Sequence, residues 1–367
     1  MRKALAILPM LAAGCAPAAG IGHFPASEQA QLRLRDGEDV AAMRRHAWRV
    51  LADVTRPGRD GAPAWLGWAP IARTFGGAGA SPARPFRRID IAETPGIALL
   101  QASGAPLLSL VLFNDPAYRH IRGERLYSRA RLDAINAGFG AAAPLAARTI
   151  APFPREAMAV KTVWAVVHPD RPTPISVWDG AGDAPDGNRP ARWPRTVLVG
   201  PGATPLDHFF HLPIAADELA TVRAIDPEAR PGDHLVLLAM HLTTREIPDW
   251  IWTTYWWHDR PDVGPFAADR PPAVAGAWRH YLMDVAYSAA TPPEADGTAN
   301  IAFNPYLETF AAGTRSNCMA CHQGAVWAPG GAAPFLPVTR GPRAPGDPRF
   351  ARGTRLDFMW SIATEAR

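Results

Sequence analysis

Cysteine is scarce in this chain of 367 residues, which contains only Cys15, Cys318 and Cys321. Cys15 ends an apolar N-terminal segment, and the other two cysteines stand three positions apart in one motif. Because no further cysteine is left to form a disulfide, the disulfide framework of small secreted domains is excluded. Apolar residues make up 48% of the chain, so we expect a fold that depends on a hydrophobic core.

Lysine is nearly absent as well. Lys3 and Lys161 are the only lysines, and the other basic side chains of fixed charge are arginines. The formal net charge is +4, and it falls to +2 when Arg2 and Lys3 of the N-terminal segment are removed. A charge this small does not indicate a nucleic acid or an acidic membrane surface as a partner.

Long apolar runs are missing except at the N-terminus, which reads MRKALAILPMLAAGC. Two basic residues followed by about ten apolar ones predict a secretory signal peptide, too short to span a membrane stably. Its end resembles the lipobox of bacterial lipoproteins. This resemblance implies lipidation of Cys15 and, because Ala16 rather than an aspartate follows, a periplasmic position at the outer membrane. Leu11 stands four positions before the cysteine instead of the usual three, and ordinary cleavage with loss of Cys15 is the alternative.

A motif near the C-terminus is the main indication of function in the sequence. Residues 316–325 read SNCMACHQGA, in which Cys318, Cys321 and His322 form the pattern C-x-x-C-H. Two thiols at this spacing reach the two vinyl groups of one porphyrin, and the adjacent imidazole turns under the iron. The motif therefore predicts one covalent haem c, with Cys318 and Cys321 as thioether attachment sites and His322 as the proximal axial ligand.

Two other interpretations of the motif are a zinc site and a redox dithiol. Zinc would need a fourth Cys or His ligand, and none lies close to the motif in sequence. A thioredoxin-like dithiol needs a βαβ setting, which the flanking pattern does not show.

The pattern of the whole chain predicts an α+β fold in two domains. A β-rich, sandwich-like domain precedes a small, mostly α-helical cytochrome c-like domain, and a Pro-rich linker at 290–300 separates them. The expected parts are a lipoprotein-type signal peptide (1–15), a tether with an N-terminal helix (16–59), the β-rich domain (60–290) and the haem domain (291–367).

Hydrophobic periodicity places the expected elements. Helices are predicted over 36–58 with Asp36 as the cap, over 128–140, and over 356–366. Apolar, Val-rich runs predict strands within 96–114, 159–169, 195–202 and 234–259, the last as a pair joined near Glu246.

The sixth iron ligand separates an electron carrier from an enzyme. Met359 is a candidate because many small c-type cytochromes place a distal Met before the last helix, although it also fits an apolar helix face. His241, on a predicted strand, and His258 compete for the position, and His280 and Met283 are weaker candidates. Each of these residues also has an ordinary structural explanation, and an open or water-filled site is the third possibility.

Aromatic and histidine clusters elsewhere are weaker signals. Four of the 13 tryptophans crowd into eight residues, which suggests either core packing, the interpretation we favour, or an aromatic wall against a haem. The DHFFHL segment holds an isolated histidine pair that could bind a metal but is more typical of a turn. The residues concerned are Trp250, Trp252, Trp256, Trp257, Asp207, His208 and His211.

Three stretches together resemble a bacterial family of exported cytochrome c proteins: WDG, PGDHLVLLAMHLTTREIPDWIWTTYWWHD and NPYLETFAAGTRSNCMACH. Members of this family carry a β-rich region ahead of one C-terminal haem motif, and the likeness covers residues 40–367. The resemblance implies the haem roles of Cys318, Cys321 and His322, and it implies no substrate.

These observations predict a lipid-anchored monohaem c-type cytochrome of the cell envelope. We expect it to carry single electrons to or from a redox partner protein in the periplasm. The alternative is a haem enzyme with an open distal site, peroxidase-like or acting on small nitrogen or oxygen species. A sensor is a third possibility, but no signalling domain is attached.

Overall fold

The computed structural model describes residues 24–58, 61–76, 84–88, 107–140, 143–179, 193–289, 302–308, 317–332, 350–351 and 353–367. Cys15 with the expected signal peptide, and the expected linker at 290–300, lie outside these residues.

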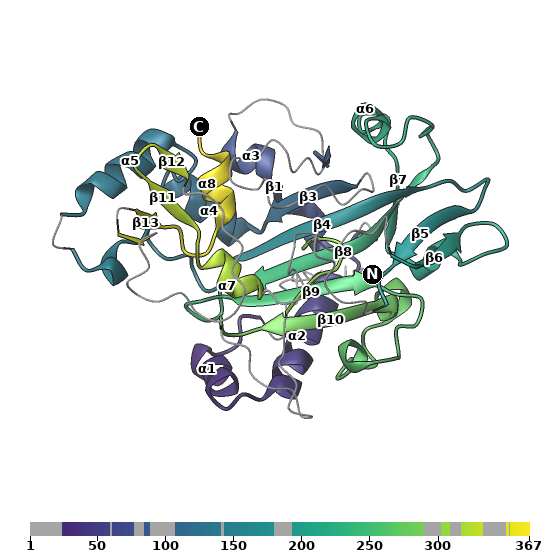
Figure 1. Ribbon diagram of the computed structural model, residues 1–367, viewed down its shortest axis with the longest axis horizontal. Helices are drawn as coiled ribbons and strands as arrows, with labels where there is room; N and C mark the ends of the chain where they lie inside the picture. The colour runs from purple at the N-terminus through teal and green to yellow at the C-terminus, as the bar shows by residue number, and fades with distance from the viewer. Residues whose placement is uncertain are drawn as a thin grey trace, which may run out of the picture.

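An antiparallel sheet of eight strands forms the centre of the molecule (Figure 1). Its main path runs in the order β1, β3, β4, β8, β9, β10, while β2 pairs with β3 and β7 pairs with β8. The strands are β1 (Ala69–Pro70), β2 (Arg87–Arg88), β3 (Leu108–Phe113), β4 (Met158–Val167), β7 (His211–Pro213), β8 (His234–Thr244), β9 (Ile251–Trp257) and β10 (Tyr281–Ala286).

Two smaller antiparallel sheets accompany the large one. One joins β5 (Thr173–Val177) to β6 (Arg195–Val199), and the other joins β11 (Val326–Ala328) to β12 (Gly331–Ala332) and β13 (Thr354–Arg355). The expected β-rich, α+β character is confirmed. Among the described residues, helices rather than a second large sheet cover the central sheet, so the architecture differs from the expected sandwich.

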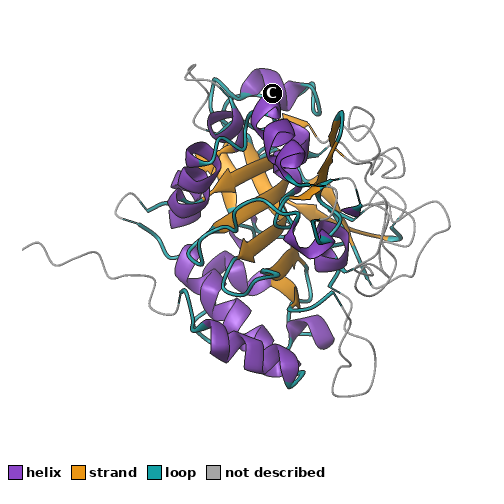
Figure 2. Ribbon diagram, turned by 90° about the vertical axis from the view of Figure 1, so that its left-hand side faces the viewer, coloured by secondary structure: helices purple, strands orange, loops and turns teal. Residues whose placement is uncertain are grey.

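Eight α-helices are described, and Figure 2 shows the sheet running between groups of them. Ser128 caps the helix expected over 128–140, and the terminal helix is shorter than expected. The helices are α1 (Glu28–Asp36), α2 (Val40–Val54), α3 (Ile71–Phe75), α4 (Asp115–Gly123), α5 (Arg129–Gly138), α6 (Leu219–Arg223), α7 (Cys318–His322) and α8 (Trp360–Glu365).

The first expected helix is divided into two. Asp39, not Asp36, caps α2, because its carboxylate accepts a hydrogen bond of 2.9 Å from the Ala42 N–H. Asp36 instead ends α1, which lies in the segment expected to be a patternless tether. That segment carries no apolar stripe, and only Gln31 of α1 is buried, so hydrophobic periodicity gave no signal.

The helix α2 packs on one face of the sheet. Its apolar side is buried in the larger core, and the Tyr255 hydroxyl of β9 donates a hydrogen bond of 2.9 Å to the Ala47 carbonyl. Side chains alternate between the faces of a strand, so Trp252, three residues before Tyr255, points to the opposite face.

That opposite face carries α4, α5 and the C-terminal segment in one shared core. The core runs across the expected boundary at residue 290, and the described part of the C-terminal segment does not form a separate helical domain. Described residues after His322, such as Leu356 and Ile362, share this core with Phe113 and Trp252 of the sheet. Members of this core include Phe75, Phe113, Ile121, Leu132, Trp252, Met319, Leu356 and Ile362.

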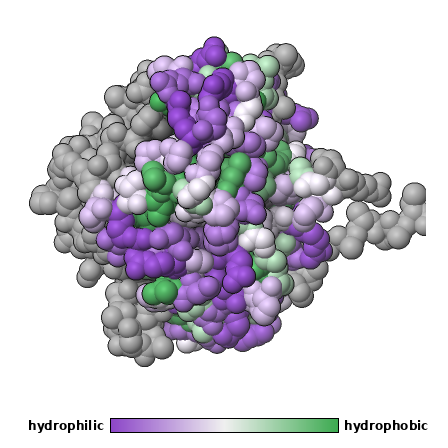
Figure 3. Space-filling view, turned by 90° about the vertical axis from the view of Figure 1, so that its right-hand side faces the viewer, coloured by the Kyte–Doolittle hydropathy of each residue, from purple (hydrophilic) through white to green (hydrophobic). Residues whose placement is uncertain are grey.

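The surface at the β5–β6 end is largely hydrophilic, with apolar side chains in small separate patches (Figure 3). Leu198 and Val263 are the large apolar side chains that are exposed among the described residues. In the described parts of the chain, no helix has the length and apolar character needed to cross a bilayer.

Candidate functional site

The C-x-x-C-H motif forms the short helix α7, which lies against β8 and β9 (Figure 1). Asn317 begins this helix, because its side-chain oxygen accepts hydrogen bonds from the Met319 and Ala320 N–H groups, at 3.0 and 3.4 Å. Cys318 is buried and Cys321 is half-buried, and neither forms a disulfide. Two cysteines three positions apart on one helical turn lie on the same side of the helix.

One ring nitrogen of His322, Nδ1, forms a hydrogen bond, and the other, Nε2, forms none within the described residues. Its Nδ1 donates a hydrogen bond of 2.9 Å to the Phe358 carbonyl, which accepts only, so the proton of the neutral ring belongs on Nδ1. Burial lowers the pKa of His322 to about 3, against a smaller opposite effect of that hydrogen bond. The neutral imidazole therefore presents an unprotonated Nε2, the state in which histidine binds a metal.

The indole ring of Trp252, on β9, packs against the imidazole of His322. The ring centroids of Trp252 and His322 lie 4.0 Å apart with an angle of 40° between the planes. Trp252 is buried in the core, as expected for core packing, and it also contacts the motif. Trp256, by contrast, packs against Trp178 and Phe266 in the larger core.

A row of polar residues crosses the same face of the sheet. Lys161 of β4 pairs directly with His241 of β8, and His241 pairs directly with Thr254 of β9. Directly paired residues point to the same face, and Thr254 shares its face with Trp252, two positions earlier. Lys161 and His241 therefore project from the face that carries the motif.

Glu308 connects this row to the motif. One of its carboxylate oxygens lies 2.9 Å from Nε2 of His241, and the other accepts a hydrogen bond from the Asn304 N–H. Ligand atoms of His241, Glu308 and Cys318 all lie within 4.8 Å of one another. Asn304 is itself fixed, because its side-chain amide donates to Thr254 and to the Tyr255 carbonyl.

Lys161 is accessible to solvent although it lies deep in the protein. Its side chain is exposed, yet burial lowers the pKa of its ammonium group, against the opposite effects of Glu308 and Cys321. His241, Glu308, Cys321 and His322 are also partly accessible. Electrostatic effects on Lys161 and His322 link these five residues as neighbours, and we name the partly accessible surface that they form the recess.

The residues at the recess fit a covalent haem. Two thiols without a disulfide, an imidazole with a free Nε2 and partial solvent access at Cys321 and His322 suit c-type attachment. The hydrogen bond from Nδ1 to a backbone carbonyl is the usual outer contact of a metal-binding histidine.

The structure does not bring all expected ligands to the recess. His258 follows the far end of β9, about 20 Å along the strand from Trp252. Both of its ring nitrogens are used by the backbone, since Nδ1 accepts from the Arg260 N–H and Nε2 donates to the Trp178 carbonyl. His258 is thus fixed in a structural role, and burial lowers its pKa.

Met359 directly follows Phe358, whose carbonyl receives the Nδ1 proton of His322. Its main chain therefore lies on the side of the imidazole away from Nε2, and its side chain is buried in the core with Leu356 and Ile362. Met283 belongs to the other core, beside Tyr255 on the face that carries α2.

The remaining histidine candidates lie together but away from the motif. His208 stacks on His280 at a centroid distance of 4.1 Å, and His211 lies edge-on to His234 at 5.1 Å. Among the described residues, the one group of three or more His, Cys, Asp or Glu side chains with converging ligand atoms is His241, Glu308 and Cys318. His208 ends a short 3-10 helix and His211 begins β7, so the DHFFHL histidines do not converge as a metal-binding pair.

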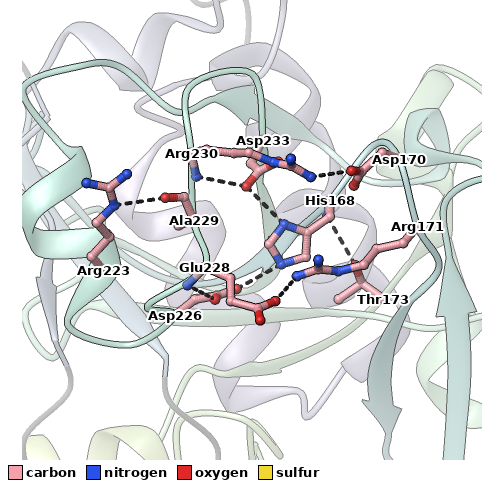
Figure 4. Close-up of polar contacts among 10 residues, drawn as sticks. All are labelled: His168, Asp170, Arg171, Thr173, Arg223, Asp226, Glu228, Ala229, Arg230 and Asp233. Carbon is pink, nitrogen blue, oxygen red and sulfur yellow. Dashed lines mark hydrogen bonds and ion pairs between the residues drawn. The ribbon is translucent and has the colours of Figure 1, made fainter.

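A second titratable cluster surrounds His168 (Figure 4). Nδ1 and Nε2 of His168 lie 2.9 Å from Asp233 and 3.0 Å from Asp226, respectively. Asp233 also accepts from the Arg230 N–H, and the Arg230 side chain pairs with Asp170. These hydrogen bonds connect the turn after β4 with the segment before β8. Because the groups bond to one another, the network has a structural role.

Sequence reasoning missed Lys161 and Glu308 as site residues. The available signal was a single lysine on an otherwise apolar strand, AVKTVWAVV, in a chain with only one other lysine. Glu308 gave no such signal, because a charged residue in an irregular segment is ordinary.

Comparison with known proteins found no matching family model, no matching curated protein and no matching solved structure. The functional assignment therefore depends on the motif and on the geometry of the recess.

Proposed function

We propose that the chain is a monohaem c-type cytochrome in which Cys318 and Cys321 form the thioether bonds and His322 is the proximal ligand. The observation that carries the proposal is the free Nε2 of His322, oriented by the Phe358 carbonyl, beside the thiols of Cys318 and Cys321, which form no disulfide. The C-terminal segment from 302 onward would act as the haem-bearing part of the protein. The haem, when bound, supplies a single-electron redox centre.

The character of the recess favours a haem whose iron also binds a small molecule. The wall facing the motif carries a lysine, a histidine and a glutamate, and all three are partly accessible. A closed electron carrier needs no such wall, whereas chemistry on a bound nitrogen or oxygen species uses polar groups to orient it and to hold protons. In this role His241 and Glu308 would hold a proton between Nε2 and the carboxylate, 2.9 Å apart.

A pure electron carrier is the second candidate, and the same pair of residues is the observation that favours it. A metal-binding histidine commonly donates its other ring N–H to a carboxylate. Glu308 contacts Nε2 of His241, which leaves Nδ1 available to serve as a sixth ligand. Single electrons would then pass to or from a periplasmic partner protein.

The N-terminal sequence supports a place in the cell envelope. We propose export by the segment 1–15 and a lipid anchor on Cys15 at the periplasmic side of the outer membrane. Covalent haem attachment at C-x-x-C-H requires an exported chain, so the two proposals agree.

The test is expression of the full chain with a haem c maturation system. Covalent haem, detected after denaturation, is expected in the wild type and in Cys15→Ser, and it is expected to be lost in Cys318→Ala/Cys321→Ala. Haem that stays covalently bound in the double variant would contradict the site. High-spin ferric iron that binds carbon monoxide after reduction would support the small-molecule role, and low-spin iron indifferent to carbon monoxide would support the carrier.

A further inference from the structure

We propose that Lys161 is the anion-binding group of the recess, and that its ligands are small monovalent inorganic anions, of the class of azide and nitrite, bound at the haem iron. The inference rests on the proposed function, because the iron is the second partner of the anion.

The position of Lys161 supports this role. It projects from the middle of the sheet, between Val111 on β3 and His241 on β8, toward the side that carries the motif. In the part of the chain that the structure describes, its ammonium group has no hydrogen-bond or ion-pair partner. A solvent-accessible ammonium group without such a partner can donate charge-assisted hydrogen bonds to an anion.

Glu308 does not take the place of the anion. Its two carboxylate oxygens are already occupied by His241 and by the Asn304 N–H. Glu308 and Lys161 influence each other at longer range, as the opposing effect of Glu308 on the Lys161 pKa indicates. The charge of Lys161 is therefore balanced only in part, and a further anion is accommodated.

The carboxylates of the haem are not the natural partner either. The thioether bonds form at the vinyl edge of the porphyrin, and the propionates lie at the opposite edge. Glu308 lies within 4.8 Å of Cys318, and the charge of Lys161 acts on both Glu308 and Cys321. Lys161 therefore borders the thioether side of the recess, where an added anion rather than a propionate can meet it.

The experiment measures anion binding to the ferric, haem-loaded full chain by absorption titration. Azide and nitrite are the anionic probes, and imidazole is a neutral ligand of the same iron. The variants are Lys161→Met, which keeps the length of the side chain without its charge, and Lys161→Arg, which keeps the charge. Arg119→Met is the matched control, because it removes the same charge from an exposed position on α4.

We expect Lys161→Met to weaken azide and nitrite binding about tenfold to a hundredfold, the usual range for loss of a charged hydrogen bond. Imidazole binding should stay near the wild-type value in that variant, and Lys161→Arg and Arg119→Met should retain anion binding.

Three results would overturn the proposal. They are azide affinity unchanged in Lys161→Met, an equal loss of azide and imidazole affinity, and a wild-type ferric haem that binds no azide. The proposed function fails by a different result, the absence of covalent haem from the wild type, so the two failures are distinguishable.

Discussion

Nδ1 of His322 and the carbonyl oxygen of Phe358 are 2.9 Å apart, and this hydrogen bond joins the C-x-x-C-H helix to the turn that begins the last helix. The turn is unusual, because Asp357 and Phe358 both have positive φ values, 46° and 66°. Such conformations are costly for residues other than glycine and persist only where the surroundings enforce them. Here they aim a carbonyl group at the imidazole.

Asp357 holds that turn in place. Its Oδ2 accepts hydrogen bonds from the Phe153 N–H at 2.9 Å and from Arg245 at 3.1 Å. Asp357→Ala should lower the free energy of unfolding by about 2–4 kcal/mol, because it leaves the buried Arg245 without its carboxylate. Denaturant unfolding measures this. Asp357→Asn retains an acceptor and should lose less, and equal losses in both variants would mean that the carboxylate charge, rather than the acceptor, stabilises the turn.

His241 and His258 should behave differently when replaced, although both were expected to compete for the haem. His241→Ala should change the spin state or the ligand affinity of the haem, because this side chain borders the recess. His258→Ala should leave the haem spectrum unchanged and lower stability by about 1–3 kcal/mol, since it removes the partners of two backbone groups. Electron paramagnetic resonance and thermal unfolding separate the two effects. A haem spectrum altered by His258→Ala alone would contradict the assignment.

These residues show what the sequence could and could not predict. The strand pair around Glu246 and the C-x-x-C-H motif could be predicted from the sequence, because apolar runs and short cysteine spacings are local patterns. The recess could not be predicted, because Lys161, Glu308 and Cys318 are separated by up to 157 positions. Strand register brings Lys161 beside His241, and tertiary packing brings Glu308 and Cys318 to His241. The helix α4 and the strand β10 were also missed. The helix α4 is amphipathic but short, with only Ala117 and Ile121 buried, and β10 is buried at every position and gives no alternation.

The stacked pair His208 and His280 should make stability depend on pH. Burial, and then the charge of His208, lower the pKa of His280 to about 4 in the folded protein, against 6.5 for the free side chain. The unfolded chain therefore binds more protons between these values, and the free energy of unfolding should fall as the pH drops from 6.5 to 4. His280→Gln should remove about 1–2 kcal/mol of this fall, a value reduced for partial exposure. Denaturant unfolding at neutral and acidic pH provides the measurement, and an unchanged pH dependence in the variant would contradict it.

The two thiols of the motif should differ in reactivity before haem is attached. Burial raises the pKa of Cys318 well above its usual value, and the charge of Glu308 adds to this effect. Cys321 is half-buried and borders the recess. Because the thiolate is the reacting form, iodoacetamide should modify Cys321 at least about tenfold faster than Cys318 in the haem-free protein. Peptide mapping by mass spectrometry measures both rates in one sample.

A matched variant separates charge from access in that experiment. Glu308→Gln removes the negative charge within 4.8 Å of the Cys318 thiol and nearly preserves the shape of the side chain. If charge contributes to the slow reaction, Cys318 should become faster in Glu308→Gln while Cys321 changes less. If Cys318 stays equally slow, burial alone protects it, and equal rates for the two thiols in the wild type would contradict the difference in burial itself. Because thioether formation also begins from the sulfur atoms, the proposed haem attachment should then begin at Cys321 when Cys318 reacts slowly.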